Sequence, residues 1–216
     1  MRRYLTEFIG TLFFVLIIGL IVTPGAPPLA PLMIGCTLMV MVYMGGHISG
    51  GHYNPAVTLA VYLRGKFLAG DVLPYMVAQI LGGTVGAYLS WLLLGASFAP
   101  APAETATTMG ALLVELLFTF LLALTVLNVA ASSETKGNSF YGLAIGFSIV
   151  VGVAAGGAVS GGVYNPAIGT GALLIHALLD GGDLGNLWIY LVAPFAGGAL
   201  AAVVFRLQEA PELEVS

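Results

Sequence analysis

The sequence predicts an all-α membrane protein with six transmembrane helices and two re-entrant half-helices, organised as an inverted repeat. Three observations support this fold class. Of the 216 residues, 59% are hydrophobic and 7% are charged, whereas an ordinary globular domain has about 25% charged residues. Six apolar runs approach the roughly 20 residues that cross a bilayer. A glycine-rich stretch containing Asn-Pro-Ala also occurs twice.

Six apolar runs account for the predicted crossings. They are Leu5–Val22, Leu32–Met44, Val72–Leu94, Leu112–Ala131, Tyr141–Ala155 and Leu187–Leu207. The first run follows two arginines and could instead be a secretory signal. However, Glu7 interrupts it, no convincing small-residue cleavage site follows Val22, and the internal repeat uses this segment. We therefore interpret it as the first transmembrane helix.

The basic residues predict the orientation. With a cytoplasmic N-terminus all six fall on the cytoplasmic side, and the loops at 23–31, 96–108 and 156–186 contain no Lys or Arg. This distribution follows the positive-inside rule. It predicts a multi-pass protein of a plasma or bacterial inner membrane, with both termini cytoplasmic. Because no basic patch is present, nucleic acid is not an expected partner. The basic residues are Arg2, Arg3, Arg64, Lys66, Lys136 and Arg206.

An internal repeat divides the chain. The stretch "SGGHYNPAVTLAVYL" at Ser49–Leu63 returns as "SGGVYNPAIGTGALL" at Ser160–Leu174, "EFIGT" returns as "ELLFT", and "YMVAQILGG" as "YLVAPFAGG". We predict one transmembrane channel domain over 1–216, with repeats at approximately 1–97 and 108–207 and a connecting outer loop at 98–107. Each half contains three crossings, so the second half is inverted in the membrane, as in many transport proteins.

Each Asn-Pro-Ala sequence predicts the start of a half-helix. Asn is a favoured N-cap and Pro a favoured first helical residue. The ten residues from Pro55 to Arg64 give roughly 15 Å of helix, about half the hydrocarbon thickness.

Two such helices would meet at mid-membrane, with free side-chain NH₂ groups and partly positive N-termini. A water held there through its oxygen would interrupt a proton wire, so we expect exclusion of cations and protons. The alternative is that Asn-Pro only begins a buried helix. The motif residues are Asn54, Pro55, Ala56, Asn165, Pro166 and Ala167.

The residues around the two motifs suggest supporting roles. Irregular backbone at membrane depth is tolerated where it is buried in protein or lines an aqueous cavity. We therefore expect a ladder of solute-binding carbonyls at Gly50, Gly51, His52, Tyr53, Gly161, Gly162, Val163 and Tyr164. Glu7 and Glu115 occupy matched positions and are expected to accept hydrogen bonds from these loops, with proton relay as the alternative. We expect His47 and His52, which flank the first loop, to brace it. No Cys or carboxylate cluster accompanies the histidines, so neither a metal nor a cofactor is expected.

The chain resembles the aquaporin and glycerol-facilitator (major intrinsic protein) family along nearly its whole length. The resemblance lies in "EFIGT", "GGHISGGHYNPAVT", "AQILGG", "ELLFTF", the second "NPA" and "WIYLVAPFAGGAL". It implies a right-handed helical bundle, one pore per subunit and a homotetramer. It also implies a selectivity filter outside the Asn-Pro-Ala level, at Ile34, Val153, Gly162 and Ile168.

The filter positions depart from the family pattern. Typical members have Arg at the last of the four positions, and water-selective members add Phe and His, whereas this chain has neither an Arg nor an aromatic ring there. We expect an uncharged, apolar filter that is wider than a water-only pore. The alternative is a hydrophobic constriction that dewets.

The leading hypothesis is a passive channel for water and small uncharged solutes such as glycerol-like polyols, urea or ammonia. The lipid bilayer and these solutes are then the partners. Alternatives are a coupled secondary transporter, for which no acidic pair is found near the Asn-Pro-Ala level, and a structural membrane protein with a poorly conducting pore. No nucleophile–base pair, metal cluster or phosphate-binding loop suggests an enzyme.

Overall fold

The computed structural model describes residues 1–209, and the regular structure of this part of the chain is helical. Six segments within it are long and apolar enough to cross a membrane, which confirms the six predicted crossings. They are α1 (Arg2–Val22), α2 (Ala30–Ser49), α4 (Ala69–Leu94), α5 (Thr108–Val126) continued by the π-helix η1 (Leu127–Ala131), α6 (Tyr141–Ser160) and α8 (Leu187–Gln208). Residues 210–216, where we expect a cytoplasmic C-terminus, lie outside the described residues.

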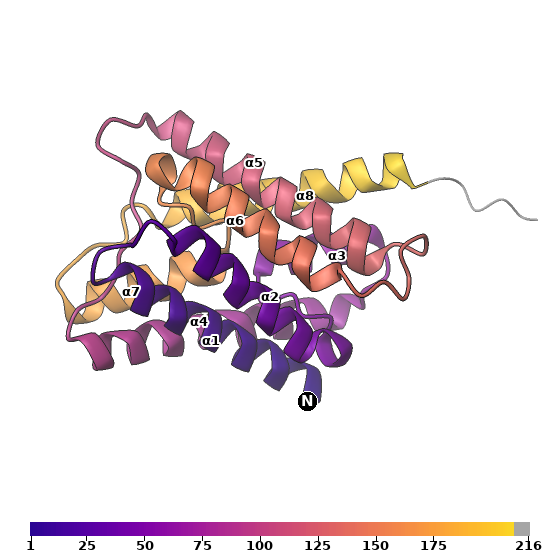
Figure 1. Cartoon of the computed structure of the whole chain (residues 1–216), viewed down its shortest axis with the longest axis horizontal. Helices are drawn as coiled ribbons and strands as arrows, with labels where there is room; N and C mark the ends of the chain where they lie inside the picture. The colour runs from indigo at the N-terminus through magenta and orange to yellow at the C-terminus, as the bar shows by residue number, and fades with distance from the viewer. Residues whose placement is uncertain (210–216) are drawn as a thin grey trace, which may run out of the picture.

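Two shorter helices follow the Asn-Pro sequences. Helix α3 (Pro55–Arg64) has the predicted bounds, and α7 (Pro166–Leu179) is its longer counterpart. Helices α2 and α6 end immediately before the glycine-rich loops, at Gly50 and Gly161, whose φ angles are 94° and 91°. This left-handed backbone suits glycine because it has no Cβ. In each half, a glycine therefore ends the long helix and an Asn-Pro pair begins the short one: α2 is followed by α3, and α6 by α7 (Figure 1).

The two halves are interlocked by their half-helices. Helix α3 of the first half packs against α8 of the second, and α7 packs against α4. At these contacts the glycines of the long helices lie against the half-helix backbone. An added Cβ on Gly198 would lie 2.4 Å from the carbonyl oxygen of Ala56, and one on Gly83 would lie 2.6 Å from that of Ala167. Small residues thus bring each half-helix to the centre of the bundle.

Long helices also pair closely through glycine. A Cβ on Gly86 of α4 would lie 2.4 Å from the carbonyl oxygen of Leu12 in α1, and one on Gly197 of α8 would lie 2.4 Å from that of Leu116 in α5. The pairs α1–α4 and α5–α8 are thus packed in the same manner in the two repeats. Backbones approach this closely only where no side chain intervenes.

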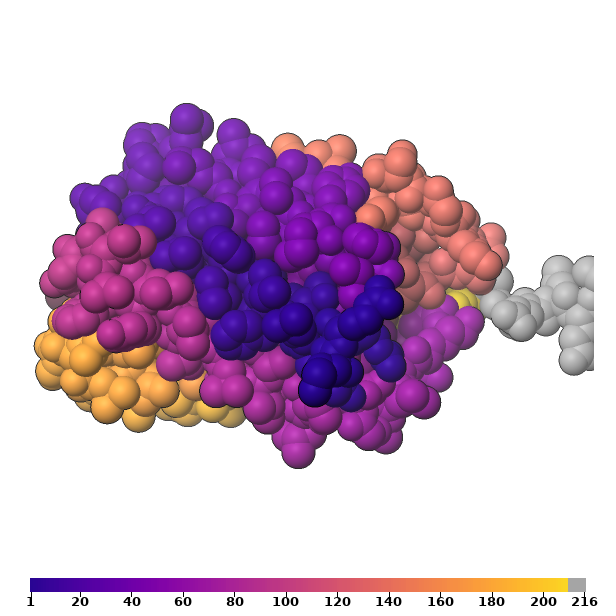
Figure 2. Space-filling model, turned by 90° about the horizontal axis from the view of Figure 1, so that it is seen from below, coloured from indigo at the N-terminus to yellow at the C-terminus, as the bar shows by residue number. Residues whose placement is uncertain are grey.

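The two ends of the bundle differ in chemistry. At one end, Arg2, Arg3 and His47 line one cavity, and His47, Lys66 and Lys136 line another. At the opposite end, the segment after α4 lies beside the end of α7, as Figure 2 shows. There Ser97 donates hydrogen bonds from its backbone N–H and its hydroxyl to Asp180. The described basic side chains therefore gather away from the 95–107 segment.

Candidate pore

The two Asn side chains cap the half-helices. Asn54 Oδ1 accepts a hydrogen bond from the N–H of Ala56, and Asn165 Oδ1 accepts one from the N–H of Ala167, each at 2.9 Å. Both Asn side chains are buried. The oxygen of each amide therefore satisfies one of the backbone donors that a helix N-terminus leaves free.

The NH₂ groups of these caps are only half free, which corrects our expectation of free groups. Asn54 Nδ2 donates to the carbonyl oxygen of Tyr164, and Asn165 Nδ2 donates to that of Tyr53, both at 2.9 Å. The tips meet so closely that each amide reaches the loop of the other half. An amide carries two N–H donors, so one donor of each Asn remains available to a molecule between the tips.

Tyr53 and Tyr164 hold an uncommon backbone conformation. Their φ angles are 48° and 52°, a region that large side chains rarely occupy. Each ring is anchored through its hydroxyl: Tyr53 donates to the carbonyl of Met41 at 3.0 Å and Tyr164 to that of Gly152 at 2.8 Å. Strained residues persist where surrounding contacts over-determine them. The anchored rings thus fix the loops from which the two bridging carbonyls come.

Glu7 supports the first loop. Its Oε1 accepts from the hydroxyl of Ser49 at 2.6 Å and the N–H of His52 at 3.0 Å, and its Oε2 accepts from the N–H of Tyr53 at 2.7 Å and Nε2 of Gln79 at 2.8 Å. The carboxylate is fully buried. Four donors around one carboxylate supply the hydrogen bonds that it gives up on leaving water.

Glu115 repeats this arrangement with one donor fewer. It accepts from the hydroxyl of Ser160 at 2.7 Å and from the N–H groups of Val163 at 2.9 Å and Tyr164 at 2.6 Å. Pro194 stands in α8 where the aligned repeat has Gln79. Each loop is therefore held by a buried Glu side chain, the first through four hydrogen bonds and the second through three.

His47 does not brace the first loop, contrary to our expectation. It is exposed in the last turn of α2, facing the cavities that contain the basic residues, and donates no hydrogen bond within residues 1–209. Of the two histidines, His52 alone is packed beside the loop: its Nδ1 lies 3.1 Å from Thr58 Oγ1 and its ring packs against Phe67 and Tyr75.

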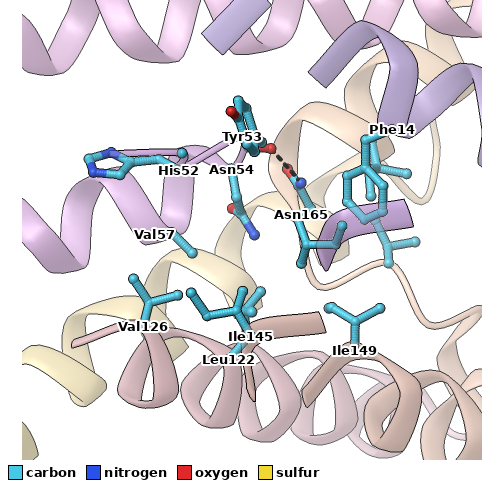
Figure 3. Close-up of a pocket in the computed structure, with 14 residues that line it drawn as sticks. Phe14, His52, Tyr53, Asn54, Val57, Leu122, Val126, Ile145, Ile149 and Asn165 are labelled. Carbon is cyan, nitrogen blue, oxygen red and sulfur yellow. Dashed lines mark hydrogen bonds between the residues drawn. The ribbon is translucent and has the colours of Figure 1, made fainter. Parts of the chain in front are cut away.

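A narrow space lies between the half-helix tips. Its free volume is about 10 Å³, the least that a cavity needs to hold one water. Figure 3 shows Asn54 and Asn165 on one side of it and a row of apolar side chains along the other. The space is polar on one wall and apolar on the opposite wall. The apolar row consists of Val126, Leu122, Ile145 and Ile149, and Val57 extends from α3 beside Asn54.

A wide cavity of about 670 Å³ continues from this space toward the 95–107 segment. All four residues of the predicted filter line it, namely Ile34, Val153, Gly162 and Ile168. Ile168 alone among these four also lines the narrow space. The predicted filter ring therefore stands mostly in the wide part of the passage.

Sequence reasoning missed Phe14, which lines both spaces. A signal was available: Phe14 follows Glu7 by two helical turns, so both lie on one face of α1. Its repeat counterpart Leu122 follows Glu115 by the same spacing and also lines the narrow space. Residues on the face that holds the loop thus also form the wall of the passage.

Some of the expected carbonyl ladder is already occupied. The carbonyls of Tyr53 and Tyr164 accept from the opposite Asn residues. Within residues 1–209, no donor reaches the carbonyl oxygens of the remaining loop residues. Acceptors for a solute are therefore available away from the tips but are shared at the tips. The remaining carbonyls are those of Gly50, Gly51, His52, Gly161, Gly162 and Val163.

A polar cluster lies at the rim of the wide cavity, which Ser97 lines. Ser97 Oγ lies 2.8 Å from His176 Nδ1 and donates to Asp180, which also accepts from Trp91 Nε1 at 3.0 Å. These hydrogen bonds, led by those from Ser97, lower the pKa of Asp180 below its usual range. His176 is thus satisfied by Ser97 and does not replace the missing arginine of the filter.

Comparison with known proteins agrees with this architecture. Residues 1–205 match the family model described as "Major intrinsic protein". This chain belongs to the major intrinsic protein family. It is 35% identical to glycerol uptake facilitator protein-like 6 of Lactiplantibacillus plantarum, with 96% of this chain and 98% of the relative covered. It is also 35% identical to aquaporin NIP1-1 of Zea mays, over 80% of this chain and 60% of the relative.

A solved structure shares the fold of this member of the major intrinsic protein family. The aquaglyceroporin from Plasmodium falciparum superimposes with a TM-score of 0.84 at 23% identity, covering 94% of each chain. Family membership and the six apolar helices make this chain an integral membrane protein. Within residues 1–209, no group of three His, Cys, Asp or Glu side chains comes together to hold a metal ion.

Proposed function

We propose that this chain is a passive channel for water and small uncharged solutes, with its passage running between the tips of α3 and α7. The observation that carries the proposal is a narrow space at Asn54 and Asn165 that adjoins a wide cavity toward one end of the bundle. None of the described residues lining either space is Asp, Glu, Lys or Arg. Such walls suit neutral permeants.

Exclusion of cations follows from what surrounds the tips. A cation would lose most of its hydration shell in a space of about 10 Å³, and none of the described residues lining that space carries a carboxylate to compensate for the loss. The remaining N–H of each Asn and the two helix N-termini also present partial positive charge. A water between Asn54 and Asn165 would accept from these donors through its oxygen, so a chain of proton transfer would be broken there.

The lining also limits the permeants. A buried hydroxyl without a hydrogen-bond partner costs about 1–3 kcal/mol, and most of the narrow space offers hydrocarbon. Polar partners lie on one side, at the Asn amides and the loop carbonyls. We therefore propose glycerol-like polyols, urea and ammonia besides water. The relatives described above, an aquaporin and a glycerol uptake facilitator-like protein, support this range.

The orientation and assembly complete the proposal. The basic end of the bundle would face the cytoplasm, in accordance with the positive-inside rule. The 95–107 segment would then lie outside, in a plasma or bacterial inner membrane. We propose a homotetramer with one pore per subunit, on the basis of the family resemblance.

Stopped-flow light scattering on proteoliposomes tests the proposal. Vesicles containing the chain should swell or shrink faster than empty vesicles with water and with at least one of glycerol, urea or ammonia. Ile168→Arg should reduce solute flux more than water flux, because Arg would add a bulky charged group to the narrow part of the passage. Rates equal to those of empty vesicles for every permeant would refute a channel. Flux that depends on an ion gradient would instead indicate a coupled transporter.

A further inference from the structure

The passage has one place where its two spaces meet. The narrow space at the tips and the wide cavity share four lining residues: Phe14, Ile149, Val163 and Ile168. We infer that these four residues, which we call the throat, set the size limit of the channel, with Phe14 as the specificity-determining side chain. This inference rests on the proposed function.

The free volume changes sharply at the throat. The outer positions Ile34, Val153 and Gly162 belong to a cavity of about 670 Å³, whereas the space beyond the throat holds about 10 Å³. Val153 and Gly162 are half-buried, so their side of the passage is open. A solute that enters the wide cavity meets little resistance there. Its passage is decided where the free volume falls to that of a single water.

The packing of α1 explains why Phe14 stands in the throat. Glu7, Gly10 and Phe14 follow one another at helical spacing on one face of this helix. Glu7 holds the first loop, and Gly10 lies so close to the Tyr53 ring that an added Cβ would be 2.5 Å from Cδ1 of that ring. Because this face is pressed against the loop, the next turn places Phe14 at the tips, where it is 2% exposed.

Phe14 limits the solute by the bulk of its ring and not by hydrogen bonding. Its ring carries no donor or acceptor, and the side chains of Ile149, Val163 and Ile168 carry none either. Figure 3 shows Phe14 and Ile149 together at the end of the narrow space opposite His52 and Val126. The repeat counterpart of Phe14 is Leu122, a smaller side chain. The aromatic ring therefore narrows one half of the passage only, and that half adjoins the wide cavity.

Replacement of Phe14 provides the test, read as relative permeability to water, urea, glycerol and a four-carbon polyol. Phe14→Ala should raise glycerol permeability severalfold and admit the four-carbon polyol, while water permeability changes less. Phe14→Leu, which copies the repeat counterpart, should give an intermediate limit and covers the case that the Ala variant fails to fold. Phe13→Ala is the matched control, because Phe13 neighbours Phe14 on α1 but is 46% exposed on the outer surface of the bundle.

A substitution at the outer positions Ile34, Val153 and Gly162, which we call the outer ring, should have no effect on the size limit. Val153→Ala should leave the solute limit unchanged, because it enlarges a cavity that is already wide. If Val153→Ala shifts the limit and both folded Phe14 variants do not, the inference is overturned and the outer ring is the filter. If the unchanged protein passes none of the permeants, the proposed function itself fails. The two failures are thus distinguishable in one set of vesicles.

Discussion

Asn54 Nδ2 lies 2.9 Å from the carbonyl oxygen of Tyr164, although the two residues belong to opposite halves of the chain. Asn165 makes the reciprocal contact with the carbonyl of Tyr53, also at 2.9 Å. Each Asn thus caps its own half-helix through oxygen and ties it to the other half through nitrogen. The tips of α3 and α7 are hydrogen-bonded to each other's loops as well as packed together.

The Asn165→Asp variant separates these two tasks. The aspartate keeps the capping oxygen but replaces the Nδ2 donor with a second acceptor facing the carbonyl of Tyr53. A buried acceptor without a donor costs about 1–3 kcal/mol, so we expect a lower melting temperature in detergent solution. Asn186→Asp is the matched control: Asn186 precedes α8 and makes no capping hydrogen bond, and a negative charge there favours the helix. Equal loss of stability in both variants would contradict the cross-loop role.

The first loop should be sensitive to Gln79. Its Nε2 donates to Glu7 Oε2 at 2.8 Å and to Thr58 Oγ1 at 2.9 Å, while its buried Oε1 has no hydrogen-bond partner among the described residues. Gln79→Leu removes a donor to a charged group, which costs about 1.5–3 kcal/mol, but also removes the unpaired oxygen. We expect a net loss of about 1–2 kcal/mol, measured by thermal or denaturant unfolding. Gln208→Leu, at the exposed end of α8, should change stability little.

Local sequence was sufficient to predict the half-helices. Asn54 and Pro55 start α3, and Gly65 follows its last residue Arg64, so each boundary is encoded by residues at that boundary. The long helices were predicted too short where composition changes within a helix. The apolar run ends at Met44, but α2 continues through Gly45 and Gly46 to Ser49.

The site was less predictable because it depends on contacts between halves. The sequence indicates that Asn54 caps a helix, but its second partner is Tyr164, which only the packed tips bring near. Phe14 likewise reads as one of many apolar residues in a membrane helix until the loop is packed against α1. Repeat alignment could have selected Phe14 with Leu122, but not its position at the narrow part of the passage.

Glycine at the half-helix contacts should not tolerate a methyl group. A Cβ on Gly83 of α4 would lie 2.6 Å from the carbonyl oxygen of Ala167, a backbone atom that moves only if α7 moves. Overpacking of this kind costs about 1–3 kcal/mol or more, and displacement of α7 would also shift Asn165. We expect Gly83→Ala to lower both the melting temperature and water permeability. Gly70→Ala is the control in the same helix: no atom of residues 1–209 beyond the adjacent helix backbone lies within 4 Å of its Cβ position, and Ala in a helix is favoured over Gly. A Gly83→Ala variant as stable as the Gly70→Ala variant would contradict the tight contact.

The rim cluster should respond to acid at a pH set by Asp180. Hydrogen bonds from the Ser97 hydroxyl, the Ser97 N–H and Trp91 hold the pKa of Asp180 below its ordinary value of 3.8. A carboxyl whose pKa is lowered on folding contributes stability that is present above its unfolded pKa and is lost as the pH falls through the folded pKa. The contact should therefore be intact at pH 5 and break below pH 3.8.

Because Trp91 Nε1 donates to Asp180, its fluorescence reports the change, in a Trp188→Phe background that leaves one tryptophan. Asp180→Asn should abolish the transition, whereas Asp183→Asn should leave it in place, because Asp183 accepts only from the N–H of Gly185 among the described residues. A fluorescence midpoint well above pH 4, or one unchanged in Asp180→Asn, would mean that another group controls the rim.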